Sequence, residues 1–260
     1  MRVVFVGAGN VATHLSAAMQ QAGFVVVQVY SRTEVHARRL ADVLHTDWTT
    51  EISAIINDAD IYVFALKDSV LKDIIAQLNP NDGFWIHTAG SVPMDVFKGY
   101  ARRYGVLYPL QTFSVDRAVD FRRIPCFTEA SSPEDEALLQ EVAGRLSDSV
   151  QPLSSEKRQY LHLAAVFAGN FTNHLYALAG KIVEEQDISP DVLLPLIDET
   201  AAKVHSLSPL KAQTGPAVRN DENVMSRHQA MLTDRAMNEI YRIISENILK
   251  EQFNYEQYKL

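Results

Sequence analysis

The feature that most constrains the fold is a glycine-rich turn between a strand-like and a helix-like segment at the start of the chain. Residues 2–6 read Arg-Val-Val-Phe-Val, and such β-branched runs are typical of buried parallel strands. The turn, residues 7–12, reads Gly-Ala-Gly-Asn-Val-Ala and leads into a helical pattern that ends near Gly23. A strand, a tight turn and a helix in this order predict the first unit of an α/β fold.

The same turn has the G-x-G-x-x-A pattern of dinucleotide-binding proteins. Gly7 allows the tight turn, Gly9 allows a pyrophosphate to approach the backbone, and the small Ala12 lets the helix pack closely on the strand. The first amides of the helix would face the phosphates with the positive end of the helix dipole. We therefore predict cofactor contacts from Gly7, Ala8, Gly9, Asn10 and Val11. A turn that has lost its ligand would have the same sequence.

The end of the second predicted strand, residues 24–30, bears on which dinucleotide binds. An NAD enzyme carries Asp or Glu there, whereas this chain has Ser31, Arg32 and Thr33. A guanidinium beside two hydroxyls suits the 2′-phosphate of NADP. Arg38 and Arg39 are either second contacts or solvated helix residues. The sequence thus favours NADP over NAD.

Composition excludes several classes of protein. The 260 residues are enough for two modest domains or one large one, and the net charge of −8 does not attract nucleic acid or anionic membranes. Residue 2 already begins a strand of the fold, so we expect no signal peptide, and no apolar run reaches the ~20 residues of a membrane span. The single cysteine, Cys126, suits a reducing cytoplasm, and no Cys/His cluster has metal-ligand spacing.

Strand and helix patterns alternate to about residue 152 and then only helical patterns remain. This order predicts a doubly wound, Rossmann-like α/β domain over residues 1–152 and an all-α domain over residues 153–260. The predicted strands are 2–6, 24–30, 45–48, 61–66, 84–87, 106–108 and 124–128. The predicted helices are 10–21, 33–44, 68–78, 93–104, one starting at 132–133, 154–185, 189–206, a short segment from 208, and 233–253.

Ligands of doubly wound sheets lie outside the carboxyl ends of the strands, where three segments of this chain fall. The segments are 65–69, 87–91 and 108–113. From them we expect cofactor contacts by Leu66, Lys67, His87, Thr88 and Ala89, and a substrate contact by Gln111. The alternatives are that Lys67 only begins a solvated helix and that residues 87–91 form a turn whose hydroxyls cap the next helix.

The long predicted helix carries an unusual polar stripe. With 3.6 residues per turn, His162 and Asn173 would be nearly aligned, with Gly169 between them and Asn170 nearby. Glycine there costs roughly 1 kcal/mol relative to alanine, which indicates a close neighbour such as a cofactor or another helix. The stripe would equally fit a buried histidine and asparagines bonded to backbone, or a subunit interface.

A second polar segment, residues 214–221, lies between the later helices. Gly215-Pro216 predicts a firm turn, and Arg219 could bind a substrate carboxylate or form an ion pair with Asp221. No serine has the strand–elbow–helix context of a serine hydrolase.

Taken together, these motifs resemble one known family over essentially the whole chain. It is the family of NADP oxidoreductases that join a Rossmann-like domain to a helical domain of unknown function. The family is distantly similar to pyrroline-5-carboxylate reductase, ketopantoate reductase and the 6-phosphogluconate dehydrogenase group. The matching features are residues 7–12, 108–113, 162–174 and Gly215-Pro216 with Arg219 and Asp221. The resemblance implies NADP binding, a cleft between the domains and a homodimer formed by the helical domains, but it supplies no substrate.

One departure limits the transfer of a mechanism. Hydroxyacid dehydrogenases of the broader group hold the substrate with a lysine and an asparagine one turn apart, whereas here His162 is followed by Val166. His162 could act as the general acid, and Asn170 and Asn173 could orient a carbonyl or the nicotinamide amide. We predict an NADP-dependent oxidoreductase that transfers hydride to a small carbonyl or imine. The alternative is an NADP-binding regulatory or sensor protein without turnover.

Overall fold

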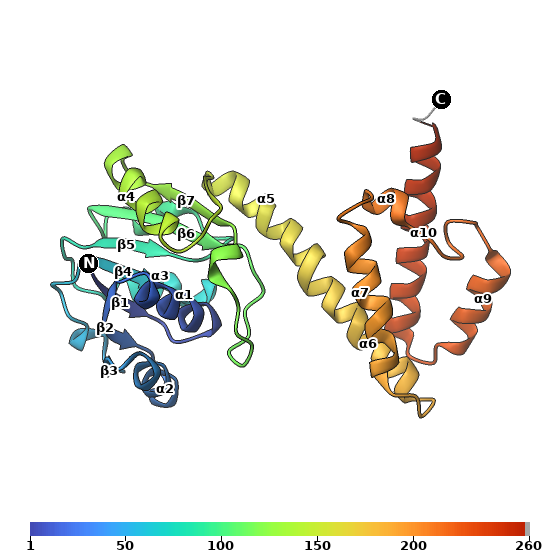
Figure 1. Cartoon of the computed structure of the whole chain (residues 1–260), viewed down its shortest axis with the longest axis horizontal. Helices are drawn as coiled ribbons and strands as arrows, with labels where there is room; N and C mark the ends of the chain where they lie inside the picture. The colour runs from blue at the N-terminus through green and yellow to red at the C-terminus, as the bar shows by residue number, and fades with distance from the viewer. Residues whose placement is uncertain (258–260) are drawn as a thin grey trace. The chain divides into compact units, whose positions relative to one another are not determined.

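The structure is a computed structural model that describes residues 1–257 (Figure 1). Its contacts divide the chain into two compact units, Met1–Asn170 and Phe171–Leu260, and each is described here by itself. The last strand ends at Pro152, where the sequence predicted the domain boundary, whereas the contacts keep the helix that follows with the first unit.

The first unit is built on one eight-stranded sheet with the order β3-β2-β1-β4-β5-β6-β7-β8. All neighbouring strands are parallel except β6 and β7, which pair antiparallel. This order confirms the predicted doubly wound, Rossmann-like α/β fold. The strands are β1 (Arg2–Val6), β2 (Val25–Tyr30), β3 (Asp47–Thr49), β4 (Ile61–Phe64), β5 (Phe84–His87), β6 (Arg103–Pro109), β7 (Cys126–Ala130) and β8 (Val150–Pro152).

Helices cover both faces of this sheet. Alternate residues of β1 point to opposite faces, so that Phe5 joins one apolar core with Leu15 and Leu139, while Val4 joins another with Leu71. The helices are α1 (Asn10–Gln21), α2 (Glu34–Leu44), α3 (Asp68–Ile75), α4 (Pro133–Gly144) and α5 (Ser155–Ala165), with short 3₁₀ turns at Ile52–Ala54, Met94–Phe97 and Phe121–Arg123. Burial of both faces explains the nearly continuous apolar runs of β1 after Arg2, of β4, and of β5 before His87.

The strand register aligns the ends of the central strands. Val6 pairs with Tyr30 and with Phe64, Phe64 pairs with His87, and His87 pairs with Val106. The loops that follow these strands therefore leave the sheet at one edge, which is where doubly wound folds bind ligands.

The helix predicted for residues 93–104 is wrong. Only Met94–Phe97 forms a 3₁₀ turn, and Gly99 then adopts the left-handed conformation with φ +87°. Tyr104 already belongs to β6 and pairs with Trp85, while Gly105 lies inside the strand. An alanine Cβ at Gly105 would come within 2.5 Å of the Glu129 carbonyl oxygen, so this glycine permits close strand approach and does not end a helix.

The rest of the described chain is helical, as predicted. The elements are a π-helical segment (Val166–Phe171), α6 (Thr172–Glu184), a 3₁₀ turn (Pro190–Leu193), α7 (Leu194–Lys203), α8 (Pro209–Ala212), α9 (Glu222–Met231) and α10 (Arg235–Gln257). Helix α9 was not anticipated, although Asp221 caps it by accepting a hydrogen bond from the Val224 amide at 3.2 Å. None of the helices within residues 1–257 combines the length and apolar composition of a transmembrane segment.

The expected alignment of His162 with Asn173 assumed a uniform α-helix, which the chain between them does not form. Residues 166–171 form π-turns, whose backbone hydrogen bonds join residues five apart instead of four. The 3.6-residue repeat used to align the two side chains does not hold across this segment. Such π-segments are often found at functional sites.

Candidate cofactor and reaction site

The glycine turn after β1 has the geometry that a bound pyrophosphate requires. Gly7 has φ +125°, and a Cβ there would lie 2.2 Å from the Ala65 carbonyl oxygen, so no other residue fits. Gly9 precedes α1 and is exposed, and a Cβ there would meet nothing within 4 Å. The first turn of α1 has neither a capping side chain nor an acidic residue. Its free amides and the open space above Gly9 fit an anionic group.

Asn10 connects this turn with the loop after β6. Its Nδ2 donates to the Phe113 carbonyl oxygen at 2.8 Å. One turn later, His14 Nε2 lies 2.8 Å from the Ser114 carbonyl oxygen, and the His14 ring stacks on Phe113 with centroids 5.2 Å apart. The Asn10 side chain is thus engaged with protein, which leaves its backbone amide for a ligand. Of the other predicted contacts here, Ala8 is buried and Val11 is half-buried.

The residues after β2 offer a free cation. Arg32 and Thr33 are exposed, and the Ser31 hydroxyl accepts a hydrogen bond from the Thr33 amide at 3.3 Å. Arg32 makes no ion pair with any residue that the structure describes. Because Tyr30 pairs with Val6, this segment leaves the sheet beside the glycine turn.

The loop after β4 also touches the glycine turn. A Cβ on Gly7 would lie 3.2 Å from a methyl carbon of Leu66, which is half-buried. Lys67 is exposed and precedes α3, and the next residue, Asp68, accepts a hydrogen bond from the Ser91 hydroxyl. This bond joins the loops after β4 and β5.

The three residues predicted to contact a cofactor at the end of β5 are all buried. His87 is fully buried, and its Nδ1 accepts a hydrogen bond from the Ala89 amide at 3.2 Å. Burial and the nearby Arg158 charge lower the pKa of His87 to about 3, so its imidazole is neutral. Thr88 and Ala89 are each 8% exposed. An enclosed imidazole cannot itself face a ligand, so a cofactor contact at His87 would involve backbone.

The neutral state of His87 predicts a pH dependence of folding. Between about pH 6.5 and 3 the unfolded chain binds a proton at His87 that the folded chain does not, so the free energy of unfolding falls as the pH falls. At pH 5, which is 1.5 units below 6.5, the free energy of unfolding should have fallen by about 2 kcal/mol. The Asn side-chain oxygen in His87→Asn can still accept a hydrogen bond from the Ala89 amide. Denaturant titrations of this variant at several pH values should therefore lack the His87 contribution to the decrease in the free energy of unfolding. The exposed His36→Asn serves as control and should keep it; an equal slope in both variants would contradict the prediction.

His162 and Tyr108 form a hydrogen-bonded pair beside the loop after β5. His162 Nδ1 lies 3.0 Å from the Tyr108 hydroxyl oxygen, and the two rings meet edge to face at 6.0 Å. A Cβ on Gly90 would come within 2.6 Å of the same Nδ1. The pair therefore joins the end of β6, helix α5 and the loop after β5. The sequence singled out His162 but not this partner, which is 54 residues away in the chain.

A buried ion pair fixes the start of α5, and sequence reasoning missed it. Arg158, whose side chain is 1% exposed, donates to the Glu129 carboxylate of β7 at 2.6 Å and to the Val92 carbonyl oxygen at 2.7 Å. The Ser155 hydroxyl donates to the same carboxylate at 2.6 Å. These bonds anchor the first turn of α5 to the sheet and to the loop after β5. His162 follows Arg158 by one turn, so the anchor sets its position. The spacing of Ser155, Arg158 and His162 on one helix face was the available signal.

The remaining predicted residues are exposed and scattered. Gln111 is exposed and accepts a hydrogen bond from the Thr112 amide at 2.8 Å. Asn170 is exposed at the end of the first unit, whereas Asn173 and Arg219 are exposed in the second. Within the described chain, the close neighbour of Gly169 is Thr112: a Cβ on Gly169 would lie 3.1 Å from the Thr112 methyl group.

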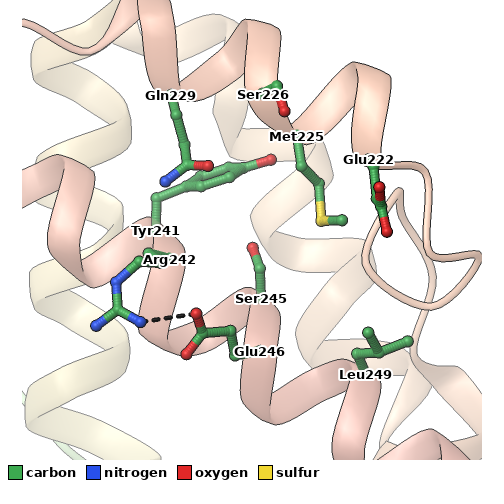
Figure 2. A pocket seen from close by; sticks show the side chains of 9 residues that line it. All are labelled: Glu222, Met225, Ser226, Gln229, Tyr241, Arg242, Ser245, Glu246 and Leu249. Atoms are coloured by element: carbon green, nitrogen blue, oxygen red, sulfur yellow. Dashed lines mark hydrogen bonds and ion pairs between the residues drawn. The ribbon is translucent and has the colours of Figure 1, made fainter.

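Two cavities lie among the described residues of the second unit. One, between α9 and α10, has a volume of about 270 Å³ and is lined mainly by polar side chains, together with Met225 and Leu249 (Figure 2). Among the polar side chains, Arg242 donates to Glu246 at 2.7 Å. The other is a groove of about 880 Å³ lined mainly by α6 and α10, with apolar residues such as Leu175, Ile182 and Ile244. Within residues 1–257, no group of His, Cys, Asp or Glu side chains is arranged to hold a metal ion.

Comparison with protein families supports the resemblance seen in the sequence. Residues 2–87 match the family described as "NADP oxidoreductase coenzyme F420-dependent", and residues 124–248 match "Domain of unknown function (DUF2520)". No curated protein matches the chain significantly.

Solved structures extend these matches to nearly the full length. A protein from Bacteroides fragilis assigned to the NADP oxidoreductases is 49% identical, with a TM-score of 0.91 over 96% of this chain and 98% of its own. A reductive aminase from Aspergillus terreus, in complex with NADPH and ethyl-5-oxohexanoate, is 17% identical, with a TM-score of 0.72 over 96% and 94% of the two chains. A 1-pyrroline-5-carboxylate reductase from Streptococcus pyogenes is 12% identical, with a TM-score of 0.66 over 97% and 98%. The last two show likeness of fold alone. With a glycine-rich turn after β1 and a relative of 49% identity along almost its whole length, the chain belongs to the NADP oxidoreductase family of enzymes.

Proposed function

We propose that this oxidoreductase uses NADPH to reduce a small carbonyl or imine compound. The proposal depends on one observation: the glycine turn and the His162–Tyr108 pair lie at the same edge of the sheet. The glycine turn follows β1, and the His162–Tyr108 pair touches Gly90 in the loop after β5, at the same end of the parallel strands. A nucleotide site and a proton donor at one edge are what a hydride-transferring reductase needs.

The residues present fit NADP. Amides of residues 7–11 would receive the pyrophosphate, Ser31, Arg32 and Thr33 the 2′-phosphate, and residues 66–67 and 87–89 the ribose and nicotinamide side. When bound, the reduced cofactor supplies a hydride to the substrate carbon. The protein's part is to orient the two reactants and to supply a proton.

His162 is the proposed proton donor. As hydride reaches the carbonyl or imine carbon, the electron pair of the double bond moves to oxygen or nitrogen. This atom then takes a proton from the imidazolium, which is left neutral. Asn170 and Asn173 would orient the substrate or the nicotinamide amide, and Gln111 and Arg219 would bind other substrate groups.

The helical domain is the proposed dimer interface. Among the described residues of the second unit, only Ala217 and Met237 are buried hydrophobic residues. Exposed apolar side chains such as Ile182 and Ile244 line the large groove. Apolar surface of this extent favours burial against a second copy of the chain. The free, buried Cys126 agrees with the proposed cytoplasmic location.

Calorimetry and a substrate panel test the proposal. NADPH should bind the purified protein more tightly than NADH, and NADPH oxidation should follow addition of a reducible carbonyl or imine. Coenzyme F420, which the family description names, belongs in the panel as a hydride acceptor. If no nicotinamide coenzyme gives a heat of binding, the glycine turn does not bind the cofactor and the proposed reductase activity is refuted. Tight NADPH binding without turnover on any compound would favour a sensor.

The preference for NADP rests on Arg32. In Arg32→Asp, loss of a charge-assisted phosphate contact should weaken NADPH binding about 10- to 100-fold, with little effect on NADH. Titration of both coenzymes measures the difference. Arg102→Asp is the matched control, since it makes the same charge change before β6, at the opposite edge of the sheet. Equal losses of NADPH and NADH affinity would contradict the assignment.

A further inference from the structure

We propose that Tyr108 is a positioning residue for His162, whose hydroxyl holds Nδ1 of the imidazole and leaves Nε2 to meet the substrate. This inference deepens the proposed function and rests on it for the identity of the reaction. The contact itself is a property of the protein alone and can be tested without a substrate.

The direction of the hydrogen bond follows from the surroundings of Tyr108. Tyr108 is 8% exposed, and burial raises the pKa of its hydroxyl above its ordinary value, so the phenol keeps its proton. His162 Nδ1 is the hydrogen-bond partner of this hydroxyl in the described chain. A buried hydroxyl without an acceptor is costly. With neutral imidazole, the hydroxyl therefore donates to Nδ1, and the imidazole proton lies on Nε2.

The imidazole is confined on its other sides. A Cβ on Gly90 would lie 2.6 Å from Nδ1, 2.7 Å from Cγ and 2.9 Å from Cβ of His162, so the ring rests directly on the glycine backbone. The buried Arg158–Glu129 pair holds the preceding turn of α5. Nε2 makes no hydrogen bond within residues 1–257 and is not among the ring nitrogens sealed from solvent, unlike Nε2 of His87. One nitrogen is thus occupied and the other is available.

A hydroxyl suits both protonation states of the imidazole. It accepts from Nδ1–H in the imidazolium and in the neutral ring just after Nε2 has given up its proton, and it donates to Nδ1 of the resting neutral ring, whose proton lies on Nε2. When the proton on Nε2 passes to the substrate oxygen or nitrogen, the hydrogen on Nδ1 stays and is donated to the Tyr108 oxygen. The ring therefore keeps its orientation through the transfer, which phenylalanine at position 108 would not ensure.

The test is ¹⁵N NMR of histidine side chains in the whole, cofactor-free protein at alkaline pH. His162→Gln identifies the signals of His162 among those of the eight histidines. In the wild-type protein His162 should have a protonated Nε2 and a hydrogen-bonded, unprotonated Nδ1. Tyr108→Phe should produce a mixture of the two tautomers. Tyr104→Phe, in the same strand but with no side-chain hydrogen bond among the described residues, is the matched control and should leave the signals unchanged.

Gly90→Ala provides a second variant. The added methyl group should displace the ring and change the same signals, whereas Gly144→Ala, where a Cβ meets nothing within 4 Å, should not. A protonated Nδ1 in the wild-type protein, or an unchanged tautomer in Tyr108→Phe, would overturn the inference.

Kinetics separate the two proposals. If a substrate is found, Tyr108→Phe should lower kcat about three- to tenfold, with NADPH affinity unchanged. If no carbonyl or imine is reduced, the proposed function fails, while the NMR result still decides the role of Tyr108.

Discussion

Replacing His162 with alanine should lower kcat for the carbonyl or imine substrate by about 10²- to 10⁴-fold, the range that general acids contribute. NADPH affinity should stay close to that of the unchanged protein, because within residues 1–257 no hydrogen bond joins His162 to the glycine turn or to the segment after β2. Steady-state kinetics and calorimetry on the same preparation measure the two quantities.

The control is His205→Ala, which removes an exposed imidazole from the turn after α7. It should change neither kcat nor cofactor affinity. A His162→Ala variant with kcat near that of the original protein would remove this residue from the mechanism. Equal losses of kcat and NADPH affinity would instead indicate that His162 supports the nucleotide site.

Local sequence patterns were sufficient for most of the nucleotide-binding half. The run Val3–Val6 and the turn after it have local causes: β-branched residues fill a strand buried on both faces, and Gly7 is the residue that its φ of +125° permits. The start of α4 could also be predicted from local sequence, because the Ser132 hydroxyl caps the helix by accepting a hydrogen bond from the Asp135 amide at 3.1 Å.

Features that depend on contacts between distant parts of the chain could not be predicted from local sequence. Residues 100–104 have helical spacing, but pairing with β5 draws Arg103 and Tyr104 into β6. The π-segment 166–171 has no simple sequence signature, and it altered the predicted polar stripe. Tyr108 and His162 meet only because a buried ion pair, formed by residues distant in sequence, anchors α5. Single candidate residues such as His162 could be recognised in the sequence, whereas their hydrogen-bond partners depended on tertiary structure.

That anchor gives the largest expected effect on stability. Glu129→Gln leaves the Arg158 guanidinium charged, 1% exposed and without its counter-ion, and Nε of Arg158 already has no hydrogen-bond partner within the described residues. Removing one partner of a buried pair costs about 3–5 kcal/mol. Denaturant unfolding should show a loss of this size. Because α5 carries His162, kcat should fall as well.

Two comparisons decide whether an isolated buried charge is the cause. The double variant Glu129→Gln with Arg158→Met removes the charge too, so it should be more stable than Glu129→Gln alone. Glu246→Gln breaks an ion pair of similar length, 2.7 Å, between exposed side chains of α10 and should change stability little, since Arg242 stays solvated and keeps its ion pair with Glu239. Equal stabilities of the single and double variants would mean that Glu129 acts through its hydrogen bonds to Ser155. The charge of Arg158 would then have no part in anchoring the helix that carries the proposed proton donor.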